Sequence, residues 1–187
     1  MTPYYLLMAR EGFGVAKPDE PEVDHTARIL SHQLWRSGLI EDPPLAAWVR
    51  GRETLAPDWV WGSRQVPLLS GAFREVVEEF LTEVDEVQWL PATLRNADGT
   101  EEARWIPHFP GERDILDVER TDWGPSGLPI AWVLSPEKME GISFITRPQH
   151  SGTLIVNGDI MRALRRAKLT GFTVMRARVA DPKESAE

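Results

Sequence analysis

The sequence TLIVNGDIMRALRRAKLTGFTVMRARV, residues Thr153 to Val179, predicts a strand, a capped helix and a second strand. Its apolar start, Leu154 to Val156, suits a buried strand. Asn157-Gly158-Asp159 then predicts a helix N-terminus, because Asn and Asp side chains accept hydrogen bonds from the N–H groups of a first helical turn. Helical spacing follows, with an apolar face of Ile160, Ala163, Leu164 and Ala167 and an outer face of Arg162, Arg165 and Arg166. We expect Gly171 to take the left-handed conformation that ends a helix and Phe172 to begin the final strand.

The earlier stretch VPLLSGAFREVVEEFLTEVDEVQWLPATL, residues Val66 to Leu94, has the same layout. Leu68 and Leu69 lead into a Ser70-Gly71 cap, and a helix is expected from Phe73 to Glu83. Its apolar face is Phe73, Val76, Val77 and Phe80, and its outer face is Glu75, Glu78 and Glu79. The two expected helices therefore share one pattern and carry opposite charge. Internal duplication explains this pattern, and so does the general similarity of helices that pack on a sheet.

The composition is that of a soluble globular domain. The chain has 187 residues, enough for one well-packed core, and a net charge of −8 from 21 basic and 29 acidic residues. An acidic surface repels phosphates, so the charge disfavours nucleic acid as a partner. The absence of cysteine rules out disulfides and cysteine chemistry. Met1 to Met8 lacks the features of a signal peptide, no stretch is long and apolar enough to span a membrane, and we expect a cytoplasmic protein.

The rest of the sequence predicts short strands joined by turns. Tyr4 to Met8 is the first expected strand, Val87 to Leu94 has the apolar character of a central strand, and Asp98-Gly99 is a hairpin signal. The other expected segments are a loop from Arg10 to Asp24, an irregular segment over the core from Glu41 to Trp61 with room for one short strand, a strand from Ala103 to Pro107 with Trp105 inward, strands at Ile115 to Val118, Ile130 to Leu134 and Gly141 to Thr146, and a loop from Thr121 to Pro129.

These elements predict an α+β fold. We expect a single domain over residues 1–180, with a mixed or mainly antiparallel sheet and two main helices packed on it. Residues 181–187 are polar and are expected to form a flexible tail.

One group of carboxylates is a candidate site for a hard cation or for acid–base catalysis: Asp114, Asp117, Glu119 and Asp122. The calcium-loop pattern is absent from it, and strand alternation sends neighbouring side chains to opposite faces. A solvated strand edge carrying charge is the preferred explanation of the group.

The histidines do not form a metal-binding pattern. His108 and His150 lie near prolines without the spacing of a zinc site, and His25 and His32 have no evident third ligand. No catalytic, cofactor or metal site is therefore predicted.

The outer face of the Phe73–Glu83 helix is the candidate binding surface. Glu75, Glu78 and Glu79 fall within an arc of roughly 100° opposite the apolar stripe. Such a face is either simply solvated or docks a basic protein partner. The eight tryptophans likewise have two alternative explanations, which are packing in the core and a platform for a ligand.

Four stretches of the sequence carry a family resemblance: PLLSGAFREVVEEF (Pro67 to Phe80), VQWLPATL (Val87 to Leu94), DILDVERTDW (Asp114 to Trp123) and GTLIVNGDIMRALRRAKLTGFTVMRARV (Gly152 to Val179). In this order they resemble immunity protein family 11 of bacterial polymorphic toxin systems, over roughly residues 38–179. The resemblance implies a small cytoplasmic protein that binds and neutralises a toxin, and it implies no catalytic residues.

The leading hypothesis is therefore an immunity protein that neutralises a cognate protein toxin, encoded nearby, without catalysis. One alternative is a metal-dependent hydrolase that uses the carboxylates of Asp114 and Asp117. The other is a ligand-binding module with a tryptophan-rich surface.

Overall fold

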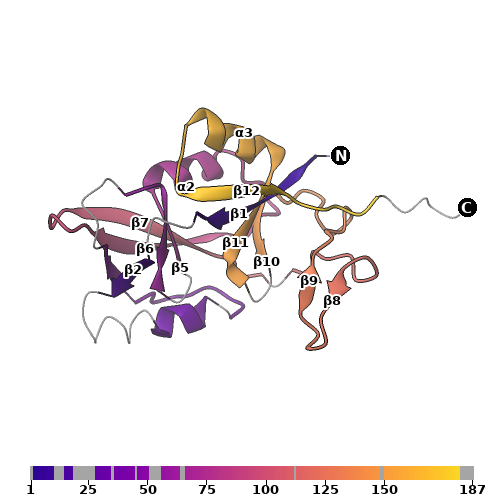
Figure 1. Ribbon diagram of the computed structural model, residues 1–187, viewed down its shortest axis with the longest axis horizontal. Helices are drawn as coiled ribbons and strands as arrows, with labels where there is room; N and C mark the ends of the chain where they lie inside the picture. Colours follow the sequence, from indigo (N-terminus) through magenta and orange to yellow (C-terminus); the bar gives the residue numbers. More distant parts are fainter. Residues whose placement is uncertain are drawn as a thin grey trace, which may run out of the picture.

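The computed structural model describes residues 2–10, 15–18, 28–34, 36–44, 46–50, 56–63, 66–111, 113–147 and 150–181. In this part of the chain the strands form a four-stranded sheet, a closed six-stranded barrel and a separate two-stranded sheet, with helices beside them (Figure 1). This mixture, dominated by strands, agrees with the expected class, but the strands are divided among three sheets. The expected tail falls almost wholly outside the described residues.

The four-stranded sheet is built around the N-terminal strand, β1 (Tyr4–Ala9). It pairs antiparallel with β11 (His150–Asn157) on one side and with β12 (Phe172–Arg176) on the other. β10 (Phe144–Arg147) completes the order β10-β11-β1-β12. The helix α3 (Gly158–Arg166) joins β11 to β12, which confirms the strand, helix and strand predicted from the last part of the sequence.

The barrel has the strand order β2-β3-β6-β7-β5-β4, closed by pairing of β4 with β2. Its strands are β2 (Val15–Pro18), β3 (Ala46–Val49), β4 (Trp59–Gly62), β5 (Val66–Leu69), β6 (Gln88–Arg95) and β7 (Glu101–His108). The loop expected from Arg10 to Asp24 is therefore wrong at β2, and of its other residues only Arg10 lies in the described part of the chain. The pairs β3–β6 and β2–β4 are parallel, and the other pairs are antiparallel.

Alternation along β7 corrects the expected position of Trp105. Ile106 is fully buried in the barrel core with Leu90 and Leu94 of β6, and Arg104 on the same side of β7 is also buried. Trp105 must then point to the outer surface of the barrel, where it is only half-buried. A helical segment at residues 28–33 contributes Leu30 to the same core.

A second core joins the barrel to one face of the four-stranded sheet. It contains Trp59 from the barrel, Leu154 from the sheet, Phe73 and Val77 from α2 (Gly71–Glu78), and Leu164 from α3. The two helices lie side by side over this core (Figure 1). Helix α2 ends before the expected Glu83, because Thr82 and Asp85 form a turn of their own in which the Asp85 carboxylate accepts from the Thr82 N–H at 2.8 Å.

The end of α3 differs from the prediction. Lys168, with φ 56°, is the left-handed residue that follows the helix, and the Leu169 N–H donates to the Leu164 carbonyl at 3.2 Å. Gly171 is also left-handed, with φ 95°, but it serves a different contact. It lies so close to the backbone of Trp59 that a β-carbon at this position would clash with the Trp59 carbonyl oxygen.

The other face of the four-stranded sheet is covered by two segments, residues 115–116 and 132–142, with Ile115, Met139 and Ile142 buried against Ile145 and Ile155. The strand expected from Ile115 to Val118 is wrong, since only an isolated bridge between Leu116 and Leu134 forms there.

The expected loop from Thr121 to Pro129 contains a strand at Asp122–Trp123. The strand expected from Ile130 to Leu134 lies instead at Pro129–Ala131. β8 (Asp122–Trp123) and β9 (Pro129–Ala131) form a two-stranded hairpin that projects at the end of the molecule opposite the barrel (Figure 1).

Candidate functional site

The acidic face of α2 lies where the sequence predicts it. Ser70 caps the helix by accepting the Phe73 N–H at 3.1 Å, and burial of Phe73 and Val77 fixes which side of α2 turns inward. Three glutamates are consequently exposed on the outer side: Glu75, Glu78 and Glu79. Their exposure fits a docking surface and equally fits a solvated helix.

The acidic face of α2 also contains a cation, Arg74. The Arg74 guanidinium pairs with the Glu78 carboxylate at 2.8 Å, and its Cζ lies 4.1 Å from the Trp105 ring centroid. Arg74 therefore neutralises part of the charge of Glu78 and is itself held in place. Glu75 and Glu79 make no ion pair within the described residues, so they carry the negative charge of this face.

Helix α3 presents the opposite charge next to α2. Arg162, Arg165 and Arg166 are exposed, and Arg162 pairs with Asp159 on the same helix. The predicted contrast between an acidic and a basic outer face is thus present on two neighbouring helices.

The carboxylates at residues 114–122 do not form one site, because Asp114 and Asp117 have different hydrogen-bond partners. Lys138 Nζ lies 2.5 Å from Asp114 Oδ2, and this hydrogen bond holds the pKa of the Asp114 carboxyl below its usual value. Asp117 accepts the backbone N–H groups of Glu119 and Arg120, each at 3.1 Å. Among the described residues, no three His, Asp or Glu side chains lie close enough together to hold a metal ion.

The histidines are likewise apart. His108 is completely buried, with Nε2 2.7 Å from the Gly38 carbonyl oxygen, which ties the segment before β3 to the end of β7. His32 is exposed on the helical segment at residues 28–33. His25 and the side chain of His150 lie outside what the structure describes.

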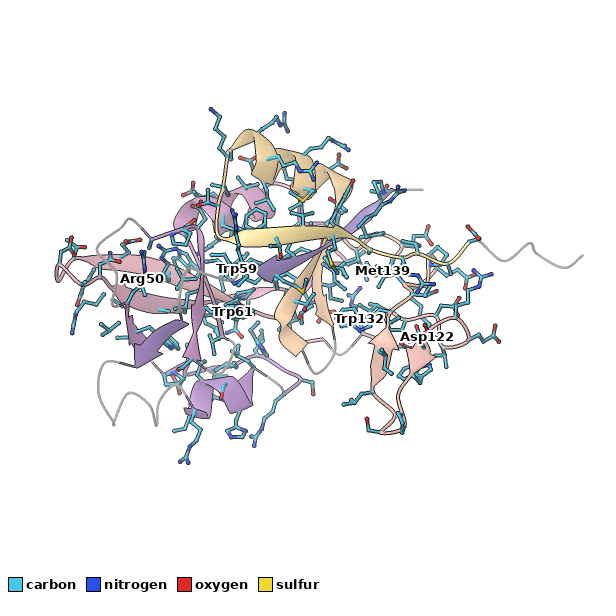
Figure 2. All side chains as sticks on the ribbon, viewed as in Figure 1. Arg50, Trp59, Trp61, Asp122, Trp132 and Met139 are labelled. Atoms are coloured by element: carbon cyan, nitrogen blue, oxygen red, sulfur yellow. The ribbon has the colours of Figure 1, made fainter. Side chains whose placement is uncertain are left out.

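Most of the described tryptophans lie in or against the cores, whereas Trp105 is half-buried on the outside of the barrel and Trp123 is exposed. Trp48 and Trp59 are fully buried, and Trp123 is 44% exposed on the β8–β9 hairpin. Figure 2 shows Trp59 and Trp61 in the middle of the molecule and Trp132 at the hairpin end. The described tryptophans therefore do not share one platform, and Trp35 lies outside them.

The hairpin itself is the feature that sequence reasoning missed. Four large hydrophobic side chains are exposed at or beside it: Val118, Trp123, Leu128 and Ile130. Its signal in the sequence is WGPSGLPI, in which turn residues separate two short apolar pieces, but a loop was the simpler interpretation of so many glycines and prolines.

A scan against models of known protein families found no matching family, and a search of curated proteins found no matching protein. The resemblance to immunity protein family 11 therefore rests on the four quoted stretches alone. Among the described helices, none is long and apolar enough to cross a membrane.

Proposed function

We propose that this protein is an immunity protein of the cytoplasm, which binds and neutralises a cognate bacterial toxin, encoded nearby, without catalysis. The sequence resemblance motivates the proposal. Residues 1–180 would form its immunity-type domain, and the family-like part spans about residues 38–179. The structural observation that carries it is the fixed acidic face of α2, at Glu75, Glu78 and Glu79.

Inhibition by occlusion requires a rigid surface with charge that complements the partner. The cap at Ser70 and the buried Phe73 and Val77 keep α2 from rotating, so its acidic face is held in one orientation before binding. Such preorganisation lowers the entropy lost on association. A negative face also steers a positively charged partner and raises the association rate.

Co-expression with the protein encoded beside it tests the proposal, with cell survival and co-purification as readouts. Survival together with a stable complex is the expected result. Survival without a complex would contradict direct binding and favour enzymatic removal of a toxic product. A neighbour that is harmless and unbound would contradict the proposal as a whole.

The role of the acidic face has its own test. Reversing Glu75 and Glu79 to Lys should slow association about tenfold at low salt and flatten its salt dependence, measured by stopped-flow or surface plasmon resonance. Glu78 is left unchanged because it pairs with Arg74. Reversing Glu41 and Asp42, two exposed residues before β3, makes the same change in net charge and should have a smaller effect. Equal effects of the two variants would remove α2 from the docking surface.

A further inference from the structure

Exposed apolar side chains are concentrated at the β8–β9 hairpin. Of the eight large hydrophobic side chains exposed in the described part of the chain, four lie within residues 118–130. Val118 is 58% exposed, Trp123 44%, Leu128 50% and Ile130 73%. Single exposed hydrophobic residues are normal on a protein surface, but several on one projecting element indicate an interaction site.

The base of the hairpin is firmly held. Thr121 is buried, and its hydroxyl accepts the Val133 N–H at 3.2 Å and donates to the Val133 carbonyl at 3.4 Å. A hydrogen bond orients the indole ring of Trp123, because its Nε1–H donates to the Val118 carbonyl at 3.0 Å. The apolar side chains are thus presented on a fixed base instead of a free loop.

Beyond its base, the hairpin has an exposed apolar surface that no described residue covers. Trp123, Leu128 and Ile130 are all exposed, although Ile130 lies beside Gly124, where an added β-carbon would be 3.3 Å from the Ile130 Cδ1. A two-stranded sheet by itself is marginally stable, since it buries little apolar surface. Contact with a partner would bury these side chains and stabilise the hairpin at the same time.

The charges next to these side chains indicate the chemistry of the partner. Asp117, Glu119 and Asp122 all lie within six residues of Trp123. The Arg120 guanidinium donates to the Asp181 backbone carbonyl at 2.8 Å and keeps its positive charge, so three carboxylates and one cation leave this stretch a formal charge of −2. The rim of the apolar hairpin is therefore mainly negative, and a basic border on the partner would complement it.

We propose that residues 118–131 form a docking hairpin, which inserts Trp123, Leu128 and Ile130 into an apolar pocket bordered by Lys and Arg on the toxin. This inference rests on the proposed function. The hairpin would supply most of the apolar contact between this protein and the toxin. A second copy of the chain is a poorer occupant, because two acidic rims would repel each other. Tryptophan at the centre of such a contact is the residue type that most often dominates binding energy.

Binding of the purified protein encoded beside it, measured by isothermal titration calorimetry, tests the docking hairpin. Trp123→Ala and Ile130→Ser should each weaken binding about 100-fold, in the range of interface residues that dominate affinity. The matched control is Leu39→Ser, because Leu39 is 71% exposed and lies outside the hairpin. Its affinity should equal that of the wild type. Circular dichroism and thermal unfolding check that all three variants fold.

The outcomes separate the two proposals. If the wild type binds and the hairpin variants bind equally well, the docking hairpin is wrong and the immunity function stands. If the wild type does not bind, the immunity function fails, and the hairpin fails with it as a site for this protein.

Two other occupants give their own results. A concentration-dependent dimer in sedimentation equilibrium that Ile130→Ser abolishes would show that a second copy covers the hairpin and would overturn the toxin as occupant. Co-sedimentation with phosphatidylcholine–phosphatidylglycerol vesicles that Ile130→Ser abolishes would overturn it in favour of a lipid surface.

Discussion

Two parts of the molecule have the same topology. In the barrel, β5 and β6 both pair antiparallel with β7, and α2 connects them. In the four-stranded sheet, β11 and β12 both pair antiparallel with β1, and α3 connects them. Each unit is therefore a pair of parallel strands, joined by a helix and separated by one antiparallel strand. We call them the barrel unit and the sheet unit.

The two units differ in the further strands with which their outer strands pair. In the barrel unit, β6 pairs further with β3 and β5 with β4, so the barrel closes. In the sheet unit, β12 remains an edge strand. The local pattern of apolar residues and caps thus specifies the unit, whereas strands from elsewhere in the chain decide which sheet it joins.

The two units are also joined to each other. Asp58, just before β4, accepts from the Ser70 hydroxyl at the cap of α2 and from the Thr170 N–H after α3, both at 2.8 Å. Phe73 of α2 packs edge-to-face on Phe172 of β12, with ring centroids 5.8 Å apart. Each of these contacts can be removed by a single substitution, which tests how far one unit depends on the other.

Gly171→Ala should have the largest effect. The new β-carbon would clash with the Trp59 carbonyl oxygen, and the left-handed φ of 95° would be strained as well. We expect a loss of roughly 3 kcal/mol or more in the free energy of unfolding, measured by urea denaturation. The control is Gly127→Ala, which has φ 74° and open space around it, and it should cost about 1 kcal/mol. Similar losses would show that the sheet unit does not depend on close approach to β4.

Asp58→Ala should follow, at roughly 2 kcal/mol, because it leaves donors of both units without their acceptor. Asp98→Ala is the control, since Asp98 accepts only from Thr100 within one exposed turn, and its cost should be under about 1 kcal/mol. Urea denaturation measures both, and a loss for Asp58→Ala no greater than for Asp98→Ala would mean that Asp58 does not couple the units.

The Phe73–Phe172 contact should give a smaller, coupled effect. In a double-mutant cycle of Phe73→Leu and Phe172→Leu, we expect a coupling free energy of about 0.5–1.5 kcal/mol. Phe73→Leu combined with Ile115→Val is the control cycle, because Ile115 lies in the core on the other face of the sheet. Additivity in both cycles would show that the aromatic contact contributes no energy beyond area burial.

The helix ends should give the smallest effects, with opposite signs. Lys168→Gly removes the backbone strain of a non-glycine residue in the left-handed conformation, so it should stabilise the protein by about 0.5–1 kcal/mol. Glu79→Gly, at the right-handed end of α2, should destabilise it by a similar amount. Thermal unfolding measures both, and effects of the same sign would mean that the two helices do not end in different ways.

The sequence by itself determined the local units of this protein. Apolar residues at helical spacing between Ser70 and Phe80, and again after Asn157, specify helices whose caps the structure contains, because these signals act within one turn. The exposure of Glu75, Glu78 and Glu79 follows from the same periodicity.

Only the tertiary structure decided how strands are shared among sheets. The pairing of β1 between β11 and β12 joins residues more than 140 positions apart, and no local pattern encodes it. The side of β7 that faces inward depends on the closure of the barrel, which is why Trp105 was misplaced. The exposed hairpin is a tertiary feature for the same reason: Trp123 and Ile130 are apolar residues of ordinary types, and only the absence of a covering layer in the described structure leaves them on the surface.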